Sequence, residues 1–386
     1  MSDLEHKALL PAGLRDMLPP DAAFEAEIVE RLVAFLGARG YVRVKPPLVE
    51  FEDSLLSGAG VAVSPDTFRL MDPVSQRMMG VRADITPQIA RIALSRLAAA
   101  ARPLRLSYAG EVLRVRGTQL RPERQFVQVG AELIGAAGPL ADAEIIVTAT
   151  EALAAIGVGG LSVDLTTPRL VPLVCARFGL EGEAGRMVRA ALDRKDSVGV
   201  AAHAGPAAET LAALLAATGR FEDVYPRLQT VSLPDEAAEE RDRVGAIAAL
   251  IRNGAPDLPL TLDPVEHRGF EYHTGIGFTV FAGGVRGELA GGGRYRARGG
   301  EDDGEGERAT GFTLYVDTIL RTLTPPPAQR CILLPVGVDA AAAQALHEAG
   351  WVTVASLDEN ADPRAEAARL GCDHVLDGGV PSPVRG

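Results

Sequence analysis

Cysteine is scarce in this sequence, and its spacing excludes two kinds of protein. The 386 residues include three cysteines, Cys175, Cys331 and Cys372, and no Cys-x-x-Cys pair. Three scattered thiols fit neither a disulfide framework nor a zinc cluster. We therefore expect a protein of the reducing cytoplasm that carries no metal and no other cofactor.

The sequence also lacks a long apolar run and an excess of basic residues. No stretch reaches the roughly 20 apolar residues that cross a bilayer, and residues 1–7 do not read as a leader peptide. The net charge of −12 at pH 7 disfavours broad binding to nucleic acid or to anionic lipid, since both need a basic surface. We expect neither a membrane nor tRNA as a partner.

The sequence contains enough hydrophobic residues for two or three packed cores, because they make up 47% of the chain. Apolar spacing and turn residues together predict the secondary structure. The predicted helices cover 22–39, 87–100 and 139–156, with Thr86 as the N-cap of the second. The predicted strands cover 41–45, 77–84, 104–116, 124–134, 268–281 and 285–289, and 311–323 is predicted as a strand that passes into a helix.

Composition divides the rest of the chain into three segments. An alanine-rich stretch of about 165–260 predicts a mostly helical insertion between sheet strands. Residues 324–329 read as a stiff proline-rich linker. Residues 330–386 predict a small βαβαβ piece, which is short for a unit that folds independently.

One face of the strand over 124–134 carries polar groups beside a glycine. Gln128 and Glu132 stand on either side of Gly130, and Asp84 and Thr86 lie at a predicted strand-to-helix junction. Side chains two residues apart share a face of a strand, so an amide and a carboxylate flank a dent suited to an ammonium or an imidazole N–H. The plain alternative is a polar sheet face turned to solvent.

A second polar edge lies on the glycine-interrupted strand from Arg268 to Phe278. Arg268 and Tyr272 share a face, so a guanidinium for a carboxylate stands beside a phenol. An ordinary strand with a solvated arginine is the alternative here. Together with the acceptors above, these residues supply partners for all three polar groups of an amino acid.

These motifs resemble the catalytic domain of histidyl-tRNA synthetase over about residues 11–320. The resemblance rests on Arg82-Ala-Asp-Ile-Thr86, Gln125-Phe-Val-Gln128, Arg268-Gly-Phe-Glu-Tyr272 and Ala290-Gly-Gly-Gly-Arg-Tyr295. It implies an α+β fold over residues 1–323, a class II aminoacyl-tRNA synthetase-like antiparallel sheet flanked by helices. For residues 330–386 it implies a small α/β domain that resembles part of an anticodon-binding domain.

The same resemblance implies a histidine-binding role for eight residues. Asp84, Thr86 and Gln128 would hold the α-amino group, Glu132 and Tyr272 the imidazole, and Arg114 and Arg268 the carboxylate side, while His273 stands where the synthetase has a second tyrosine.

Two departures from the synthetase concern ATP. Arg116 stands where the resemblance places the glutamate that reads adenine, and a guanidinium has no acceptor for the amino group of the base. Thr318 stands where an arginine would meet the γ-phosphate, and a neutral hydroxyl does not replace a charge-assisted fork. The amino-acid half of the site is retained without the ATP half.

This combination is similar to the regulatory subunits of ATP phosphoribosyltransferase, a family of non-catalytic synthetase paralogs. The similarity implies assembly with the short-form catalytic subunit for the first step of histidine biosynthesis, feedback inhibition by histidine, and a homodimer through the class II interface. It implies no catalytic residue in this chain. The alternative is an ATP-dependent enzyme that activates an amino acid, either a histidyl-tRNA synthetase or a synthetase-like ligase.

Overall fold

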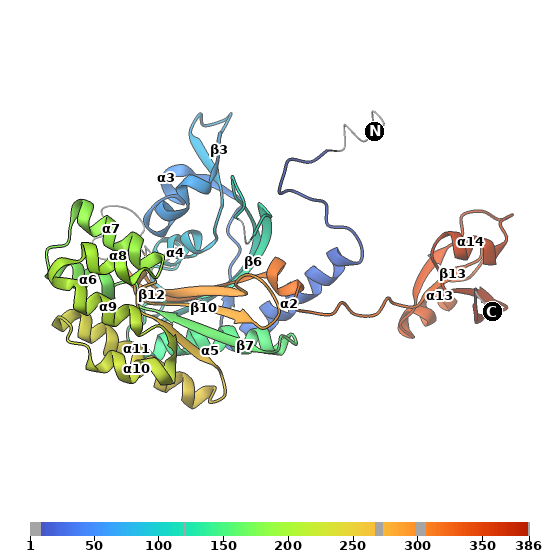
Figure 1. Ribbon diagram of the computed structural model, residues 1–386. Helices are drawn as coiled ribbons and strands as arrows, with labels where there is room; N and C mark the ends of the chain where they lie inside the picture. Colours follow the sequence, from blue (N-terminus) through green and yellow to red (C-terminus); the bar gives the residue numbers. More distant parts are fainter. Residues whose placement is uncertain (1–8, 119–120, 267–272, 298–305, 385–386) are drawn as a thin grey trace. The chain divides into compact units, whose positions relative to one another are not determined.

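The computed structural model describes residues 9–118, 121–266, 273–297 and 306–384. The chain forms two compact units, Met1–Thr324 and Pro325–Gly386 (Figure 1). Two of the predicted site residues, Arg268 and Tyr272, lie outside the described residues.

The first unit is built on a nine-stranded sheet in the order β1-β5-β6-β12-β11-β10-β7-β9-β8. All neighbouring strands in it are antiparallel except the pairs β1–β5 and β7–β9, which confirms the predicted α+β class. The strands are β1 (Val42–Arg43), β5 (Leu104–Leu113), β6 (Gln125–Ile134), β7 (Leu161–Thr166), β8 (Gly219–Arg220), β9 (Leu260–Asp263), β10 (His273–Ala282), β11 (Ala290–Ala297) and β12 (Glu307–Tyr315).

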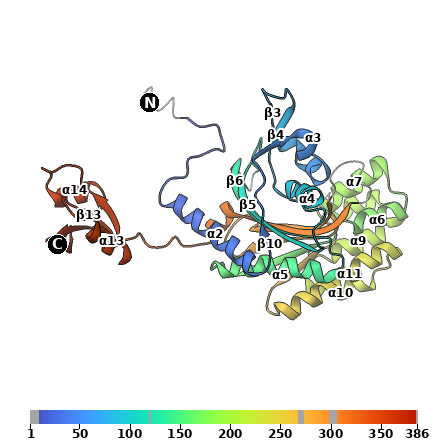
Figure 2. The ribbon, with the colours of Figure 1, turned by 180° about the vertical axis from the view of Figure 1, so that it is seen from behind.

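Helices cover both faces of this sheet. On one face, α2 (Asp21–Ala38) and α5 (Pro139–Ala155) pack on the larger apolar core, and α2 buries Phe24, Ile28 and Leu32 at helical spacing. On the other face lies α4 (Thr86–Ser95), whose Ile89 belongs to a second core with Tyr108 of β5. Figure 2 shows α5 and α4 on opposite sides of the strands. The predicted strand 124–134 is therefore buried on both faces.

The segment between β7 and β9 is mostly helical. Its longest helix, α11, packs along α5, so the larger core extends from the sheet into this segment. None of the described helices is long and apolar enough to cross a membrane. The helices of the segment are α6 (Leu170–Arg177), α7 (Gly182–Asp193), α8 (Ser197–His203), α9 (Ala208–Ala216), α10 (Phe221–Thr230) and α11 (Asp235–Gly254).

A small three-stranded sheet precedes α4. It consists of β2 (Val49–Phe51), β4 (Met78–Val81) and β3 (Phe68–Met71), in that order, with the short helices α3 (Glu52–Leu55) and η1 (Gly58–Asp66) between its first two strands in the chain.

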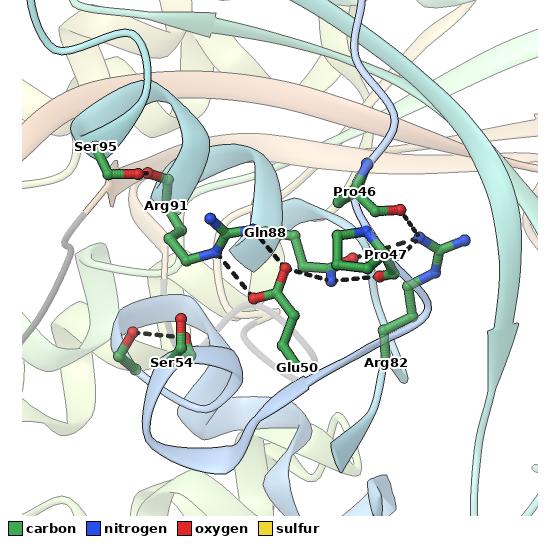
Figure 3. A network of polar contacts seen from close by, with 9 residues as sticks. Pro46, Pro47, Glu50, Ser54, Arg82, Gln88, Arg91 and Ser95 are labelled. Atoms are coloured by element: carbon green, nitrogen blue, oxygen red, sulfur yellow. Dashed lines mark hydrogen bonds and ion pairs between the residues drawn. The ribbon is translucent and has the colours of Figure 1, made fainter. Parts of the chain in front are cut away.

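A buried polar network ties this small sheet to α4 (Figure 3). The carboxylate of Glu50 accepts from Gln88 Nε2 at 2.9 Å and from Arg91 Nε at 2.9 Å. Gln88 Nε2 also donates to the Pro47 carbonyl at 2.8 Å, and Arg82 donates to the Pro46 carbonyl at 3.1 Å. The backbone around the two prolines is thus fixed to the start of α4, which carries Thr86.

Glu50→Gln should lower the free energy of unfolding by about 1–3 kcal/mol, because it leaves the Arg91 guanidinium without its buried charge partner. The Glu50 side chain is only 8% exposed. The matched control is Glu52→Gln, which removes the exposed ion pair with Arg69 and should cost less than about 1 kcal/mol. Urea unfolding of both variants measures the difference, and equal costs would contradict a structural role for this network.

The second unit is a four-stranded sheet in the order β14-β13-β15-β16. The first three strands are parallel, and β16 adds to the edge in the antiparallel direction. Its α13 and α14 sides each hold a small apolar cluster. The elements are β13 (Cys331–Leu334), α13 (Ala340–Glu348), β14 (Val352–Ala355), α14 (Pro363–Arg369), β15 (His374–Asp377) and β16 (Val380–Pro383).

The positions predicted for two elements are wrong. The strand predicted over 285–289 lies instead at Ala290–Ala297, where glycines are required because a Cβ on Gly292 would lie 2.3 Å from the carbonyl oxygen of Gly311. The helix predicted to reach residue 100 ends at Ser95. Arg102 donates to the carbonyls of Ala93, Leu97 and Ala100. These carbonyls at the end of the helix therefore have hydrogen-bond donors without another helical turn.

Candidate ligand-binding site

A row of glycines crosses the sheet beside Glu132. Glu132 of β6 is paired with Gly311 of β12, Gly311 with Gly293 of β11, and Gly293 with Gly277 of β10. A Cβ on Gly311 would lie 1.8 Å from Glu132 Oε2. The carboxylate therefore lies along a strip of bare backbone, and only glycine leaves room for it there.

The Glu132 carboxylate is held by two hydroxyl groups. Tyr295 OH donates to Oε2 at 2.9 Å, and Thr86 Oγ1 donates to Oε1 at 3.1 Å. The side chain is 1% exposed. Burial raises the pKa of Glu132 to about 8, although both hydroxyl donors act in the opposite direction. Because the pKa is raised, a ligand that brings a positive charge or an N–H would favour the ionised form of this carboxyl.

A second row of residues lies next to the first. Tyr108 of β5 faces Gly130 of β6, which in turn faces Thr313 of β12. The Tyr108 hydroxyl reaches across Gly130 and lies 2.8 Å from Thr313 Oγ1 and 3.3 Å from Thr86 Oγ1. Gly130 thus forms the depression that was predicted between Gln128 and Glu132, and the phenol of Tyr108 occupies it.

Asp84 and Gln128 form a bonded pair. Gln128 Nε2 donates to Asp84 Oδ2 at 2.9 Å, and the Thr86 amide donates to Asp84 Oδ1 at 2.9 Å. Gln128 Oε1 accepts from the Ile85 amide at 3.1 Å, and its side chain is fully buried. Gln128 therefore orients Asp84, and the Asp84 carboxylate is the acceptor of the pair that remains partly accessible.

His273 begins the described part of β10 and belongs to the same site. It is buried, and a Cβ on Gly293 would lie 2.9 Å from His273 Nε2. Burial lowers the pKa of His273 to about 3. The imidazole is therefore neutral at physiological pH and adds no positive charge that would repel a cationic ligand.

These residues enclose a small cavity of about 20 Å³. It is lined by Thr86, Glu132, His273 and Tyr295, together with Gly293 and Gly311 of the glycine row. This space holds about one water molecule. A ligand larger than a water molecule would therefore require lining side chains to move.

Arg114 lies at one edge of this site, after β5. Its Nε donates to the Ala83 carbonyl at 3.3 Å, and its guanidinium carbon is 5.1 Å from the centre of the Phe126 ring. The arginine thus holds the backbone beside Asp84, and it does not line the small cavity.

Near Thr318 lies a buried arginine whose charge is neutralised by carboxylates of the same chain. Arg121, whose side chain is 7% exposed, lies 3.2 Å from Asp317 and 3.2 Å from Glu288. Its guanidinium carbon is 3.8 Å from the centre of the Tyr315 ring. Thr318 itself is buried and accepts from Arg321 NH2 at 3.0 Å.

Arg116 is the other residue at which the sequence departs from the ATP site of the synthetase, and its position does not suit contact with a base. Its side chain is 73% exposed and pairs with Asp66 at 3.4 Å.

The structure thus brings together five of the eight predicted site residues: Asp84, Thr86, Gln128, Glu132 and His273. Thr86 is not the N-cap that was predicted, because Ile85 occupies that position and the Thr86 hydroxyl points to Glu132. Tyr295 and Thr313 also belong to the site, and they are not among the eight residues predicted from the sequence. Thr313 is paired with Gly130 and Gly291, and Tyr295 with His273, and these pairings become readable only once the strand order is known.

Within the described ranges, no group of three or more His, Cys, Asp or Glu residues is arranged to hold a metal ion.

Three comparisons with known proteins bear on this site. The chain matches the family model described as histidyl-tRNA synthetase over residues 13–319. It is 55% identical over 372 residues to a protein of Rhodospirillum centenum named ATP phosphoribosyltransferase regulatory subunit, covering 96% of this chain and 95% of the relative. A protein of Paramagnetospirillum magneticum with the same name is 54% identical over 376 residues, 97% of this chain and 98% of the relative.

A solved structure agrees in fold. The crystal structure of an ATP phosphoribosyltransferase regulatory subunit/histidyl-tRNA synthetase from Bacillus halodurans superposes with a TM-score of 0.80 at 23% identity, covering 94% of this chain and 96% of that one. At that identity the likeness concerns the fold, and it confirms the predicted class II synthetase-like architecture.

Proposed function

The chain belongs to the ATP phosphoribosyltransferase regulatory subunit family, on the histidyl-tRNA synthetase fold, and from this premise we propose that it activates a short-form catalytic subunit without performing chemistry itself. In this proposal the pair carries out the first step of histidine biosynthesis. Histidine, the end product, binds the Glu132 site and inhibits the pair. The chain also self-associates as a homodimer through the class II interface.

The observation that carries the histidine assignment is the buried Glu132 carboxyl beside the glycine row. An imidazole is flat and has N–H donors, and a bare strip of sheet backbone next to a carboxylate suits both properties. The Asp84 carboxylate, 2.9 Å from Gln128 Nε2, offers an acceptor for an ammonium group. In the proposal, Arg268, Tyr272 and Arg114 complete the contacts to histidine.

Support for a non-catalytic role comes from the other half of the site. The Arg121 guanidinium is the buried cation next to Thr318, and Asp317 and Glu288 already neutralise it. A triphosphate brought to this place would meet the Asp317 and Glu288 carboxylates as well as Arg121 and Arg321, so it would gain little net positive charge there. The exposed Arg116 gives the adenine amino group no acceptor.

Mixing the chain with a short-form catalytic subunit tests the proposal. We expect the mixture to form phosphoribosyl-ATP faster than the catalytic subunit alone, and we expect added histidine to inhibit the mixture. A rate assay with and without histidine measures both effects. A catalytic subunit that is unaffected by this chain would refute the proposal, and activation that is insensitive to histidine would refute the regulatory part of it.

The match to the histidyl-tRNA synthetase family model supports one other candidate, an enzyme that activates an amino acid with ATP. This alternative predicts histidine-dependent exchange of pyrophosphate into ATP. Our proposal predicts no exchange above background at high protein concentration.

A further inference from the structure

Two of the three cysteines meet in the second unit, although they are far apart in the sequence. Cys331 is the first residue of β13, and Cys372 lies just before β15. Their Sγ atoms are 3.1 Å apart, across 41 residues of sequence. The strand order brings them together, because β13 and β15 are neighbours in the four-stranded sheet. Both thiols are free.

Backbone hydrogen bonds hold the two cysteines in this position. The Asp373 amide donates to the Cys331 carbonyl at 3.1 Å, and the Cys331 amide donates to Asp373 Oδ1 at 2.8 Å. On the other side, the Cys372 amide donates to the carbonyl of Ala367 in α14 at 2.8 Å. The contact between the sulfurs is therefore built into the sheet and its adjoining helix.

The two thiols differ in their access to solvent. Cys331 is partly exposed, whereas Cys372 is only 4% exposed and belongs to the apolar cluster on the α14 side of the sheet. Burial raises the pKa of the Cys372 thiol. Because the thiolate is the reactive form of cysteine and must be reached by its partner, Cys331 is the thiol that a small oxidant meets first.

From this geometry we infer that Cys331 and Cys372 form a reversible disulfide within the chain when it meets a small disulfide such as oxidised glutathione. The Cys331 thiolate attacks one sulfur of the oxidant, whose S–S bond breaks and releases one thiol. The Cys372 thiolate then attacks the Cys331 sulfur and displaces the second thiol. Two protein thiols are oxidised, the oxidant is reduced to two small thiols, and these carry away the two protons.

The disulfide would act on the second unit as a covalent lock. The chain between Cys331 and Cys372 contains α13, β14 and α14, which is most of this unit. Its apolar clusters are small, and a cross-link over such a span restricts the unfolded chain. The oxidised unit is therefore harder to unfold than the reduced one, and cellular thiols return it to the reduced form. This inference does not rest on the proposed regulatory role.

Oxidation of the full chain with oxidised glutathione, followed by tryptic digestion and mass spectrometry, tests the chemistry. We expect one peptide pair joined through Cys331 and Cys372, and we expect dithiothreitol to separate it. Cys175, buried in α6 of the first unit, is the internal control and should stay a free thiol. Absence of the link, glutathione on Cys331 without the link, or a link between two chains in non-reducing electrophoresis would each overturn the inference.

The fluorescence of Trp351 tests the effect on stability. It is the only tryptophan of the chain and packs on an apolar cluster of the second unit, so its signal follows the unfolding of that unit. We expect oxidation to raise the midpoint of its thermal transition by at least about 10 °C. An unchanged midpoint in the linked protein would refute the covalent lock.

Three serine variants complete the experiment. Cys372→Ser and Cys331→Ser should each lose the rise in the Trp351 midpoint, and the partly exposed position 331 provides a test that does not alter the buried thiol. Cys175→Ser is the matched control and should show the same rise as the wild type. A rise that persists without Cys331 or without Cys372 would contradict the assignment. None of these measurements involves histidine or a catalytic subunit, so their failure leaves the proposed function untouched.

Discussion

Glu132→Gln should strongly weaken histidine binding while leaving the protein folded. The substitution keeps the size of the side chain and removes the charge that would meet the imidazole N–H or an imidazolium. We expect the affinity for histidine to fall by at least about 100-fold, the loss expected for one charge-assisted hydrogen bond in a buried site. Calorimetric titration of the isolated chain measures it.

The matched control is Glu111→Gln on β5, an exposed carboxylate that bonds to Gln125 on the sheet at 2.6 Å. Its histidine affinity should equal that of the wild type. If Glu132→Gln bound histidine as tightly as Glu111→Gln, the assignment of the imidazole to Glu132 would be wrong.

Glu132→Gln should also change how the stability of the folded protein depends on pH. The folded-state pKa of Glu132 is raised to about 8, above the value of an exposed glutamate, so its protonated form stabilises the fold at low pH. That contribution is lost as the pH rises from about 4.5 through about 8. Glu132→Gln removes this dependence, and it should be more stable than the wild type at pH 9 by on the order of a few kcal/mol. Thermal unfolding between pH 5 and pH 9 would show it.

Gly311→Ala is expected to give the largest loss of stability at the site. The new Cβ would lie 1.8 Å from Glu132 Oε2 and 2.8 Å from the Ala131 carbonyl oxygen, so the carboxylate must leave its bond with Tyr295. Crowding and the broken hydrogen bond together cost about 3 kcal/mol, and histidine binding should be lost with them.

Gly283→Ala is the control for this change, because its Cβ would meet nothing within 4 Å. It should alter the free energy of unfolding by less than about 0.5 kcal/mol. If denaturant unfolding gave similar values for the two variants, the close contact between Gly311 and Glu132 would not exist in solution.

Local patterns predicted much of the sheet. The alternation over 124–134 predicted a strand with two distinct faces, and β6 has Glu132 on one face and Val129 in the core of the other. The antiparallel partner of this strand was also predicted correctly, because the two runs are close in sequence and joined by one loop.

The contacts that complete the site could not be predicted in this way. Tyr295 bonds to Glu132 across 163 residues of sequence, and Arg121 meets Asp317 across 196. Such pairings depend on the order of strands in the sheet, which a local pattern does not contain. The glycines of β11 lowered its apparent strand propensity, yet they are required there, because a Cβ on Gly292 would meet the Gly311 carbonyl and a Cβ on Gly293 would meet His273.

Titration of histidine into the isolated wild-type chain, with and without ATP, tests the central claim most directly. The account predicts one histidine site per chain whose affinity is the same in both titrations, because the amino-acid half of the site works without a nucleotide. A chain that binds no histidine, or one that binds it only when ATP is present, would contradict the account.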